Sequence, residues 1–265
     1  MASAATDRLE AFVEGSDAGR LIEVADEILA VADLLRREPR LRRALSDPAR
    51  DGEQRIELLK SLLSGKVSDD TIDLVGALVA ERYSSPVDLL TAAERLGVDA
   101  LLGSAERADT LGDVEDELFR FGQVVDGDNV LAAALGDPTA EVGRRIELVK
   151  DLLSDKVEPV TLRLAQLALS GFGGRGFSAS LTRLVELAAA RRDRSVAYVT
   201  TAVPLTDDEE DRLAARLSEM YGRQVSPKID VDPRIIGGMR VKVGSDLYDG
   251  SVTRRLAEVR TALSK

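Results

Sequence analysis

The chain contains neither cysteine nor histidine among its 265 residues. The absence of cysteine excludes disulfides and thiol nucleophiles, and the two absences together exclude the common zinc sites. Without histidine there is also no His-dependent acid–base relay. Carboxylates and lysines remain available for chemistry, but the usual catalytic constellations are missing. We therefore expect a protein that has no catalytic residues and binds no cofactor or metal.

Aromatic residues and long apolar runs are also scarce. Aromatic residues make up 3% of the chain, whereas 44% of it is hydrophobic, so the core must be built from Leu, Val, Ile and Ala, which suits packed helices. No stretch approaches the roughly 20 apolar residues that span a bilayer. The N-terminal residues lack the basic-then-apolar layout of a signal peptide. We therefore expect no direct membrane insertion.

The net charge of −11 is unevenly distributed along the chain. Residues 1–103 carry −7, residues 104–193 carry −5 and residues 194–265 carry +1. An acidic chain repels the phosphate backbone of nucleic acids. The charge therefore predicts that nucleic acid is not a partner.

A stretch of the chain occurs twice. Residues 41–67 and 131–157 match at 15 of 27 positions with a constant offset of 90, and the Asp-Pro step and the Arg-Ile-Glu-Leu run are in both copies. Chance does not produce such a match, so the chain contains an internal duplication. We expect three domains: a first helical bundle over 1–103, a second over 104–193, and a C-terminal domain over 194–265.

Each copy is predicted to contain a long amphipathic helix, because apolar residues recur at spacings of three and four. In the first copy these are Leu21, Val24, Ile28, Val31 and Leu35, and in the second they are Leu111, Val114, Leu118, Phe121 and Val125. A short second helix ends at each Asp-Pro step, and a third carries Ile56, Leu59 and Leu62 or Ile146, Val149 and Leu152. Because only isolated glycines interrupt residues 86–118, we also expect one long helix to join the copies into an elongated rod.

A fourth helix in each copy is the candidate partner-facing element. Its apolar seams are bundle core on the simplest interpretation, but a partner groove along one of them is the alternative. The candidate residues are Ile72, Val75 and Val79 in the first copy and Leu162, Ala165 and Leu169 in the second.

The C-terminal region is predicted to be a compact α/β module in the order strand–helix–strand–strand–helix. Residues 195–203 are rich in Val, Thr and Tyr and favour a strand. Thr206 and Glu209 fit a capping box at the start of a helix. Two strands with alternating apolar residues follow, at 225–231 and 239–243, and Pro227 places the first of them at a sheet edge. The last helix carries Val252, Leu256, Val259 and Leu263.

Four segments suggest ligand sites, and each has a simpler structural interpretation. The acidic run 207–211 suits a helix N-terminus better than a metal site. The glycine-rich run 171–176 follows a helix and lacks the Gly-Lys-Ser/Thr of a phosphate loop, which favours an inter-helix turn. Gly237-Gly238 precedes a strand, unlike a dinucleotide fingerprint. Asp246 and Asp249 lack the further oxygen ligands of a calcium loop, which favours a turn.

The C-terminal segment resembles the signature of the δ subunit of bacterial F-type ATP synthases, the family that includes the mitochondrial oligomycin-sensitivity-conferring subunit. The resemblance rests on Val231-Asp232-Pro233, Ile235-Ile236-Gly237-Gly238, Val241-x-Val243-Gly244 and Asp249-Gly250-Ser251. It is supported by residues 200–205 and by the third-helix pattern at 55–63. The family motif residues, to which we assign a structural role, are Asp232, Pro233, Gly237, Gly238, Gly244, Asp249, Gly250 and Ser251.

The resemblance implies a non-catalytic stator subunit. Such a subunit joins the catalytic head, through the N-termini of the α subunits, to the peripheral stalk of b subunits, and resists rotor torque during proton-driven ATP synthesis. It lies at the cytoplasmic face of the bacterial plasma membrane as a peripheral protein. The alternative is a free-standing helical-repeat adaptor unrelated to ATP synthase.

Two features depart from the family pattern. Ordinary members have one helical bundle, and the duplicated form resembles the long δ subunits of actinobacteria. The family's opening helix, Arg-Tyr-Ala-x-Ala-Leu, is matched only weakly by residues 7–12. Because the apolar seam is preserved in both copies, we expect a division of labour, in which one copy binds the α subunits and the other binds b or acts as a spacer.

Overall fold

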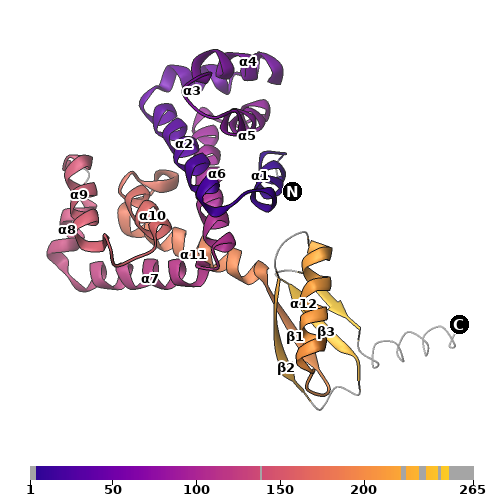
Figure 1. Ribbon diagram of the computed structural model, residues 1–265. Helices are drawn as coiled ribbons and strands as arrows, with labels where there is room; N and C mark the ends of the chain where they lie inside the picture. The colour runs from indigo at the N-terminus through magenta and orange to yellow at the C-terminus, as the bar shows by residue number, and fades with distance from the viewer. Residues whose placement is uncertain (1–3, 138, 222–224, 233–236, 244–245, 251–265) are drawn as a thin grey trace, which may run out of the picture. The chain divides into compact units, whose positions relative to one another are not determined.

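The computed structural model describes residues 4–137, 139–221, 225–232, 237–243 and 246–250. The chain divides into two compact units, residues 1–188 and residues 189–265. The first unit is helical and the second is a small α/β module (Figure 1). This architecture confirms the predicted fold class, which is mostly α with a C-terminal α/β module.

The helices of the first unit repeat in the same order at an offset close to 90 residues. The first set is α1 (Ala4–Gly15), α2 (Ala18–Arg37), α3 (Pro39–Leu45), α4 (Gly52–Leu63), α5 (Asp69–Ala80) and α6 (Pro86–Arg107). The second set is α7 (Leu111–Gly127), α8 (Asn129–Gly136), α9 (Val142–Leu153), α10 (Pro159–Leu169), the 3-10 turn η1 (Phe172–Gly174) and α11 (Phe177–Ser195). Thus α2 to α6 correspond to α7 to α11, and α1 has no separate counterpart.

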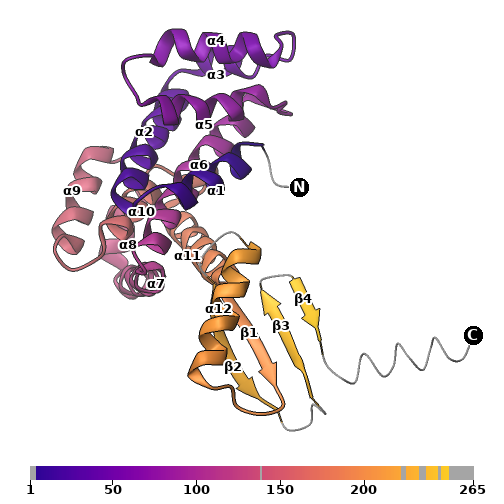
Figure 2. The same cartoon turned by 45° about the vertical axis from the view of Figure 1, so that its right-hand side comes forward.

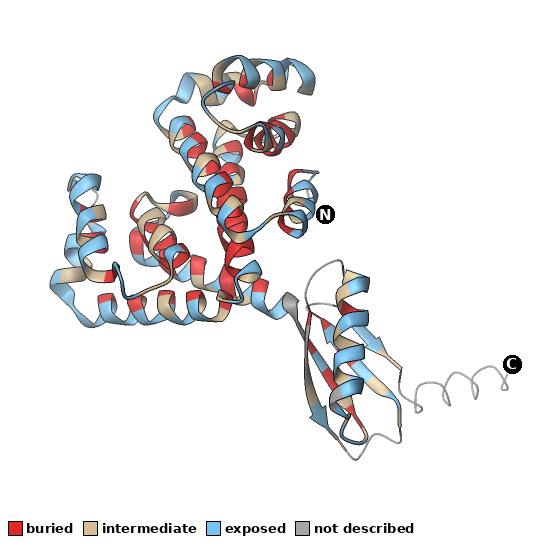
Figure 3. Cartoon of the chain, viewed as in Figure 1, coloured by how far each residue is buried: buried red, intermediate tan, exposed pale blue. Residues whose placement is uncertain are grey.

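The two predicted apolar seams are confirmed as the buried faces of α2 and α7. Every seam residue from Leu21 to Leu35 and from Leu111 to Val125 has an exposed fraction of 6% or less. Figure 3 shows the buried residues on the inner sides of these helices. The periodicity of the sequence therefore identified the core-facing sides correctly.

The predicted continuous helix over residues 86–118 is wrong, because α6 ends at Arg107 and α7 starts at Leu111. Asp109 adopts a left-handed φ of 58°. The Thr110 N–H donates to the Ala105 carbonyl at 2.9 Å and the Asp109 N–H donates to the Glu106 carbonyl at 3.1 Å. This is the Schellman arrangement that ends helices, here with aspartate in the position usually taken by glycine. Figure 1 shows α7 turning away from the α6 axis, so the two helices do not form a rod.

Helix α6 is shared by the two repeats. It lies alongside α2 in both views (Figures 1 and 2) and also contacts α10 and η1. Every residue from Leu96 to Ala105 is buried, and one apolar core extends from Ala5 to Ala188. The expected boundary after residue 103 falls inside this helix. Separate domains over 1–103 and 104–193 stay a prediction.

The second unit is a four-stranded mixed sheet with one helix. Its elements are β1 (Val196–Thr201), α12 (Asp207–Tyr221), β2 (Ser226–Val231), β3 (Met239–Val243) and β4 (Asp246–Asp249). The strand order is β2-β1-β3-β4, with β1 and β2 parallel and the other pairs antiparallel. The strand containing Pro227 lies at the sheet edge, as predicted. Figure 2 shows α12 against the sheet, where Leu217 packs in a core with Val199 and Val241.

Strand β4 differs from what the sequence predicted for this module, and the predicted final helix falls on residues that the structure does not describe. Strand β4 was not predicted, because Asp246 and Asp249 were interpreted as turn residues. Instead, Val241 and Tyr248 are paired in the β3–β4 ladder, and the Gly250 N–H donates to the Met239 carbonyl at 3.0 Å. The final helix expected after Gly250 lies outside the described residues.

Candidate functional site

A half-buried carboxylate fixes the start of helix α5 in the first repeat. Glu27 of α2 accepts hydrogen bonds from the Ser68 N–H at 3.0 Å, the Ser68 hydroxyl at 2.5 Å and the Thr71 hydroxyl at 2.5 Å. Burial alone would raise the pKa of Glu27, but the hydrogen bonds from Ser68 and Thr71 outweigh it and hold the pKa below its usual value. The ionised carboxylate therefore links α2 to the N-terminus of α5, where negative charge is favoured.

The second repeat contains the same contact. Glu117 of α7 accepts from the Glu158 N–H at 2.9 Å and from the Thr161 hydroxyl at 2.6 Å. Each of these residues lies 90 positions after its counterpart, although glutamate replaces serine at the N-cap. The duplication therefore preserves a tertiary contact as well as a sequence pattern.

A buried arginine recurs in the third helix of each repeat. Arg55 is 2% exposed, and its two terminal nitrogens donate to the carbonyls of Asp47 at 3.2 Å and Ala80 at 2.9 Å. Arg145 is 8% exposed and donates to the Leu135 carbonyl at 3.1 Å. These guanidinium groups donate to carbonyls at or just beyond helix ends, where intrahelical donors run out; the Asp47 carbonyl also accepts from the Arg50 N–H at 3.2 Å. The sequence match included both arginines but did not indicate their burial.

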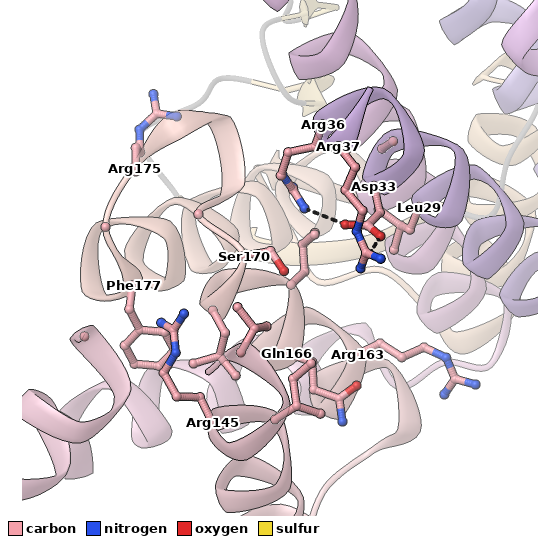
Figure 4. A pocket seen from close by; sticks show the side chains of 18 of the residues that line it. Leu29, Asp33, Arg36, Arg37, Arg145, Arg163, Gln166, Ser170, Arg175 and Phe177 are labelled. Atoms are coloured by element: carbon pink, nitrogen blue, oxygen red, sulfur yellow. Dashed lines mark hydrogen bonds and ion pairs between the residues drawn. The ribbon is translucent and has the colours of Figure 1, made fainter. Parts of the chain in front are cut away.

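A cleft of about 650 Å³ lies between α2 of the first repeat and α9, α10 and the residues flanking η1 in the second. Figure 4 shows Asp33, Arg36 and Arg37 on the α2 wall, with Arg145 and Gln166 on the opposite wall. The lining contains five arginines and two aspartates. They are Arg36, Arg37, Arg145, Arg163 and Arg175, with Asp26 and Asp33.

One ion pair joins the two walls of this cleft, and a second joins its α2 wall to α6. Arg163 of α10 contacts Asp26 of α2 at 2.9 Å. Arg36 contacts Glu94 of α6 at 2.7 Å, and Glu94 is only 2% exposed. The other carboxylate oxygen of Glu94 accepts the Gly173 N–H at 2.8 Å. Glu94 therefore connects the first repeat to the η1 turn of the second.

The glycine-rich run is an inter-helix turn, as expected. It follows α10, and Gly171, Gly173 and Gly174 adopt left-handed φ values of 79°, 63° and 73° that favour glycine. Because the Gly173 N–H already donates to a carboxylate, this donor is not available to a phosphate. The acidic run 207–211 likewise lies in the first turns of α12, where Glu209 accepts from the N–H and hydroxyl of Thr206 at 2.9 Å.

No group of acidic side chains suited to a metal ion occurs among the residues that the structure describes. Within the same described ranges, no helix is long and apolar enough to cross a membrane. The cleft between the repeats is the candidate binding site of the helical unit.

Comparison with known proteins identifies the family. The family model "ATP synthase delta (OSCP) subunit" matches residues 10–95 and 98–263. The chain belongs to the ATP synthase delta (OSCP) subunit family. The two matched segments meet inside α6, and the second contains one repeat together with the C-terminal module.

Relatives in this family match nearly the whole chain. The ATP synthase subunit delta of Salinispora arenicola is 60% identical over 261 residues, which cover 98% of this chain and 95% of that protein. The corresponding protein of Salinispora tropica is 57% identical with the same coverage. That of Streptomyces griseus is 45% identical over 258 residues, covering 97% of this chain and 94% of the relative. These actinobacterial relatives confirm the resemblance to the long form. The stator role implied by the family is supported, and the free-standing adaptor is not favoured.

The delta-family motif lies in the second unit and only part of it is described. The Asp232 N–H donates to the Thr201 carbonyl at 2.9 Å, and Gly238 adopts a left-handed φ of 81° before β3. Gly237 has a φ of 153°. The side chain of Asp249 forms an ion pair with Arg240 at 3.5 Å, and the Gly250 N–H donates to the Met239 carbonyl of β3. Pro233, Gly244 and Ser251 lie outside the described residues, so their structural role stays a prediction.

The candidate partner-facing residues of α5 and α10 lie in or against the core of the helical unit. Five of them have exposed fractions of 5% or less, and Leu162 is half-buried. The five buried residues are Ile72, Val75, Val79, Ala165 and Leu169. Their contact with a partner stays a prediction.

Proposed function

We propose that this delta-family chain is a non-catalytic connector that links the N-termini of the α subunits in the ATP synthase head to the b subunits of the peripheral stalk. The observation that supports this most strongly is the family match, which extends through both repeats and the C-terminal module. The protein would work as a peripheral component at the cytoplasmic face of the plasma membrane. The chain's own residues would supply only binding surfaces and mechanical resistance.

The architecture of the helical unit suits resistance to torque. The buried helix α6 belongs to both repeats, so a force on one repeat is passed to the other through a continuous core rather than through a linker. The Arg163–Asp26 ion pair and the hydrogen bond from the Gly173 N–H to Glu94 add cross-links between elements of the two repeats. Interiors packed in this way have low compressibility and transmit strain.

Purification of the intact complex tests the stator assignment. A tagged full-length chain should copurify with α, β and b subunits from membranes. Deletion of the chain should leave ATP hydrolysis by the head but abolish its coupling to proton transport. The purified chain should not hydrolyse ATP. ATP turnover by the pure chain would overturn the non-catalytic assignment, and absence from the purified synthase would overturn the stator role.

The division of labour between repeats can be tested at a pair of equivalent positions. Asp69 opens α5 and Pro159 opens α10; they lie 90 residues apart and both are exposed. Each is replaced in the full-length chain by the photo-crosslinking residue p-benzoylphenylalanine, and the assembled synthase is irradiated. We expect the two positions to crosslink to different subunits. Strong crosslinking of both to the α subunits would contradict the division of labour.

A further inference from the structure

The cleft between the repeats is positively charged although the helical region around it is acidic. Residues 1–193 carry a net charge of −12, whereas the cleft lining carries five arginines and two aspartates. Even when Glu94, which lies against Arg36, is included, the arginines exceed the carboxylates. A local excess of positive charge on an acidic protein favours an anionic partner at that place.

Two of the cleft arginines make no ion pair among the described residues. Arg145 is 92% buried; it donates one hydrogen bond to the Leu135 carbonyl, and its Nε has no hydrogen-bond partner. Asp137 attracts Arg145 electrostatically without a direct contact. The Oδ1 atom of Asp137 instead accepts hydrogen bonds from the N–H and the hydroxyl of Thr139. Arg175 donates only to the Gly173 carbonyl of its own turn, at 3.4 Å. Guanidinium donors are therefore available for a carboxylate, which they bind with good geometry.

Apolar side chains line the cleft together with these arginines. Leu29 from α2, Ile146 from α9, Leu167 from α10 and Phe177 from α11 line the same cleft. A free phosphate would make no favourable contact with these apolar side chains. The Gly173 N–H of the adjoining turn is also unavailable to it, because it already donates to the carboxylate of Glu94. A peptide with apolar and acidic side chains would use both kinds of surface. The volume of about 650 Å³ falls within the roughly 300–1,000 Å³ of typical binding sites.

We propose that the cleft between α2 and α9–α10 binds an acidic, amphipathic peptide segment of another subunit of the synthase. Its apolar side chains would contact Leu29, Ile146 and Phe177. Its carboxylates would reach Arg175 and also Arg37, whose exposed guanidinium contacts Asp33 through Nη2 and has further donors. This inference rests on the proposed stator function, because it assigns that function a specific contact. Since the cleft is formed by elements of both repeats, the duplication creates a binding surface that one repeat does not contain.

A matched pair of double variants tests the charge requirement. Arg37→Glu/Arg175→Glu reverses two exposed charges of the cleft, and Arg120→Glu/Arg144→Glu reverses two exposed charges elsewhere on the helical unit. Arg37, Arg120 and Arg144 each pair with a carboxylate one turn away, and their side chains are 75%, 75% and 85% exposed. The full-length chains are titrated against synthase particles stripped of this subunit, at low and high salt.

The cleft variant should bind the stripped particles at least about tenfold more weakly, with a reduced dependence on salt, because like charges would face each other. The control should stay within about twofold of the unsubstituted chain, since exposed pairs contribute little. Equal affinity of the cleft variant and the control would overturn the cleft proposal and leave the stator function intact. If the unsubstituted chain itself fails to bind stripped particles, the proposed function fails instead.

Photo-crosslinking identifies the occupant. Val142 lines the cleft and is 41% exposed, and Val87 lies outside the lining and is 53% exposed. With p-benzoylphenylalanine at Val142, the assembled synthase should yield a crosslink to an acidic segment of another subunit, which the Val87 variant should not yield. A crosslink only within this chain, or to a segment without acidic residues, would refute the proposal. So would binding of inorganic phosphate that Arg37→Glu/Arg175→Glu abolishes, without any crosslink to a subunit.

Discussion

Replacing the two buried arginines of the repeats by methionine should destabilise the helical unit to different extents. Arg55 and Arg145 occupy equivalent positions, but Arg55 donates to two carbonyls and Arg145 to one. Methionine fills a similar volume without any donor. In Arg55→Met the Ala80 carbonyl would lose its donor, and the Asp47 carbonyl would keep only the hydrogen bond from the Arg50 N–H at 3.2 Å. In Arg145→Met only the Leu135 carbonyl would lose its donor.

The magnitude follows from the number of charge-assisted hydrogen bonds, each of which contributes about 1.5–3 kcal/mol. Part of this is offset, because removing a buried cation also removes its desolvation cost. We therefore expect the free energy of unfolding to fall by about 2–4 kcal/mol for Arg55→Met and about 1–2 kcal/mol for Arg145→Met. Arg55→Lys keeps the charge but not the planar fork, so it should recover only part of the loss.

Urea unfolding followed by far-UV circular dichroism measures these differences, since the helical unit dominates the signal. The slope of the transition should stay unchanged, which shows that the variants alter stability and not the extent of the structure. If the free energy of unfolding falls equally in the two methionine variants, or falls more in Arg145→Met, the stabilisation does not follow the number of carbonyls to which each arginine donates, and the reasoning is refuted.

Further expectations concern Glu27, the α2–α6 contact and the cleft. Because the pKa of Glu27 lies below its usual value of 4.5, its stabilising effect is present above about pH 4.5 and is lost as the pH falls through the folded-state pKa. The difference in Tm between the unsubstituted chain and Glu27→Gln should therefore be largest near neutrality and shrink on acidification; a constant difference would contradict this. Gly97→Ala should lower stability by about 1–2 kcal/mol, because the added Cβ would lie 2.6 Å from a Leu29 methyl carbon. The control Gly76→Ala should stabilise by up to about 1 kcal/mol, because its Cβ would meet only Ile56, at 3.9 Å; a stabilising Gly97→Ala would count against tight α2–α6 packing. The Arg37→Glu/Arg175→Glu chain should keep the thermal stability of the Arg120→Glu/Arg144→Glu control in differential scanning calorimetry, so that its weaker binding reports the interface; a selective loss of stability would show that these arginines support the fold.

The break between α6 and α7 illustrates why some of the structure was not predictable from the sequence. The prediction of one continuous helix rested on the absence of proline and the isolation of the glycines. Asp109 supplies the left-handed residue instead, an uncommon conformation for a residue other than glycine. Whether aspartate adopts it depends on the packing of the flanking helices, and a local pattern does not contain that information.

The candidate site was even less accessible to sequence reasoning. Arg36 and Glu94 are 58 residues apart, and Arg163 and Asp26 are 137 apart, so no spacing rule brings them together. The seams of α5 and α10 were proposed as partner-facing because apolar periodicity is the same for a core face and a binding face. Burial is a property of the tertiary structure; it places five of the six candidate residues in the core, and their contact with a partner stays a prediction.

The sequence alone determined the family, the duplication, the core-facing sides of α2 and α7, and the strands β1, β2 and β3. These features depend on residues that are near one another in the chain, where period and turn chemistry are decided by local backbone geometry. Only the tertiary structure decided that α6 serves both repeats, that Arg55 and Arg145 are buried, and that five arginines line one cleft. Those properties arise from contacts between distant segments, whose free energy is set by how the helices pack.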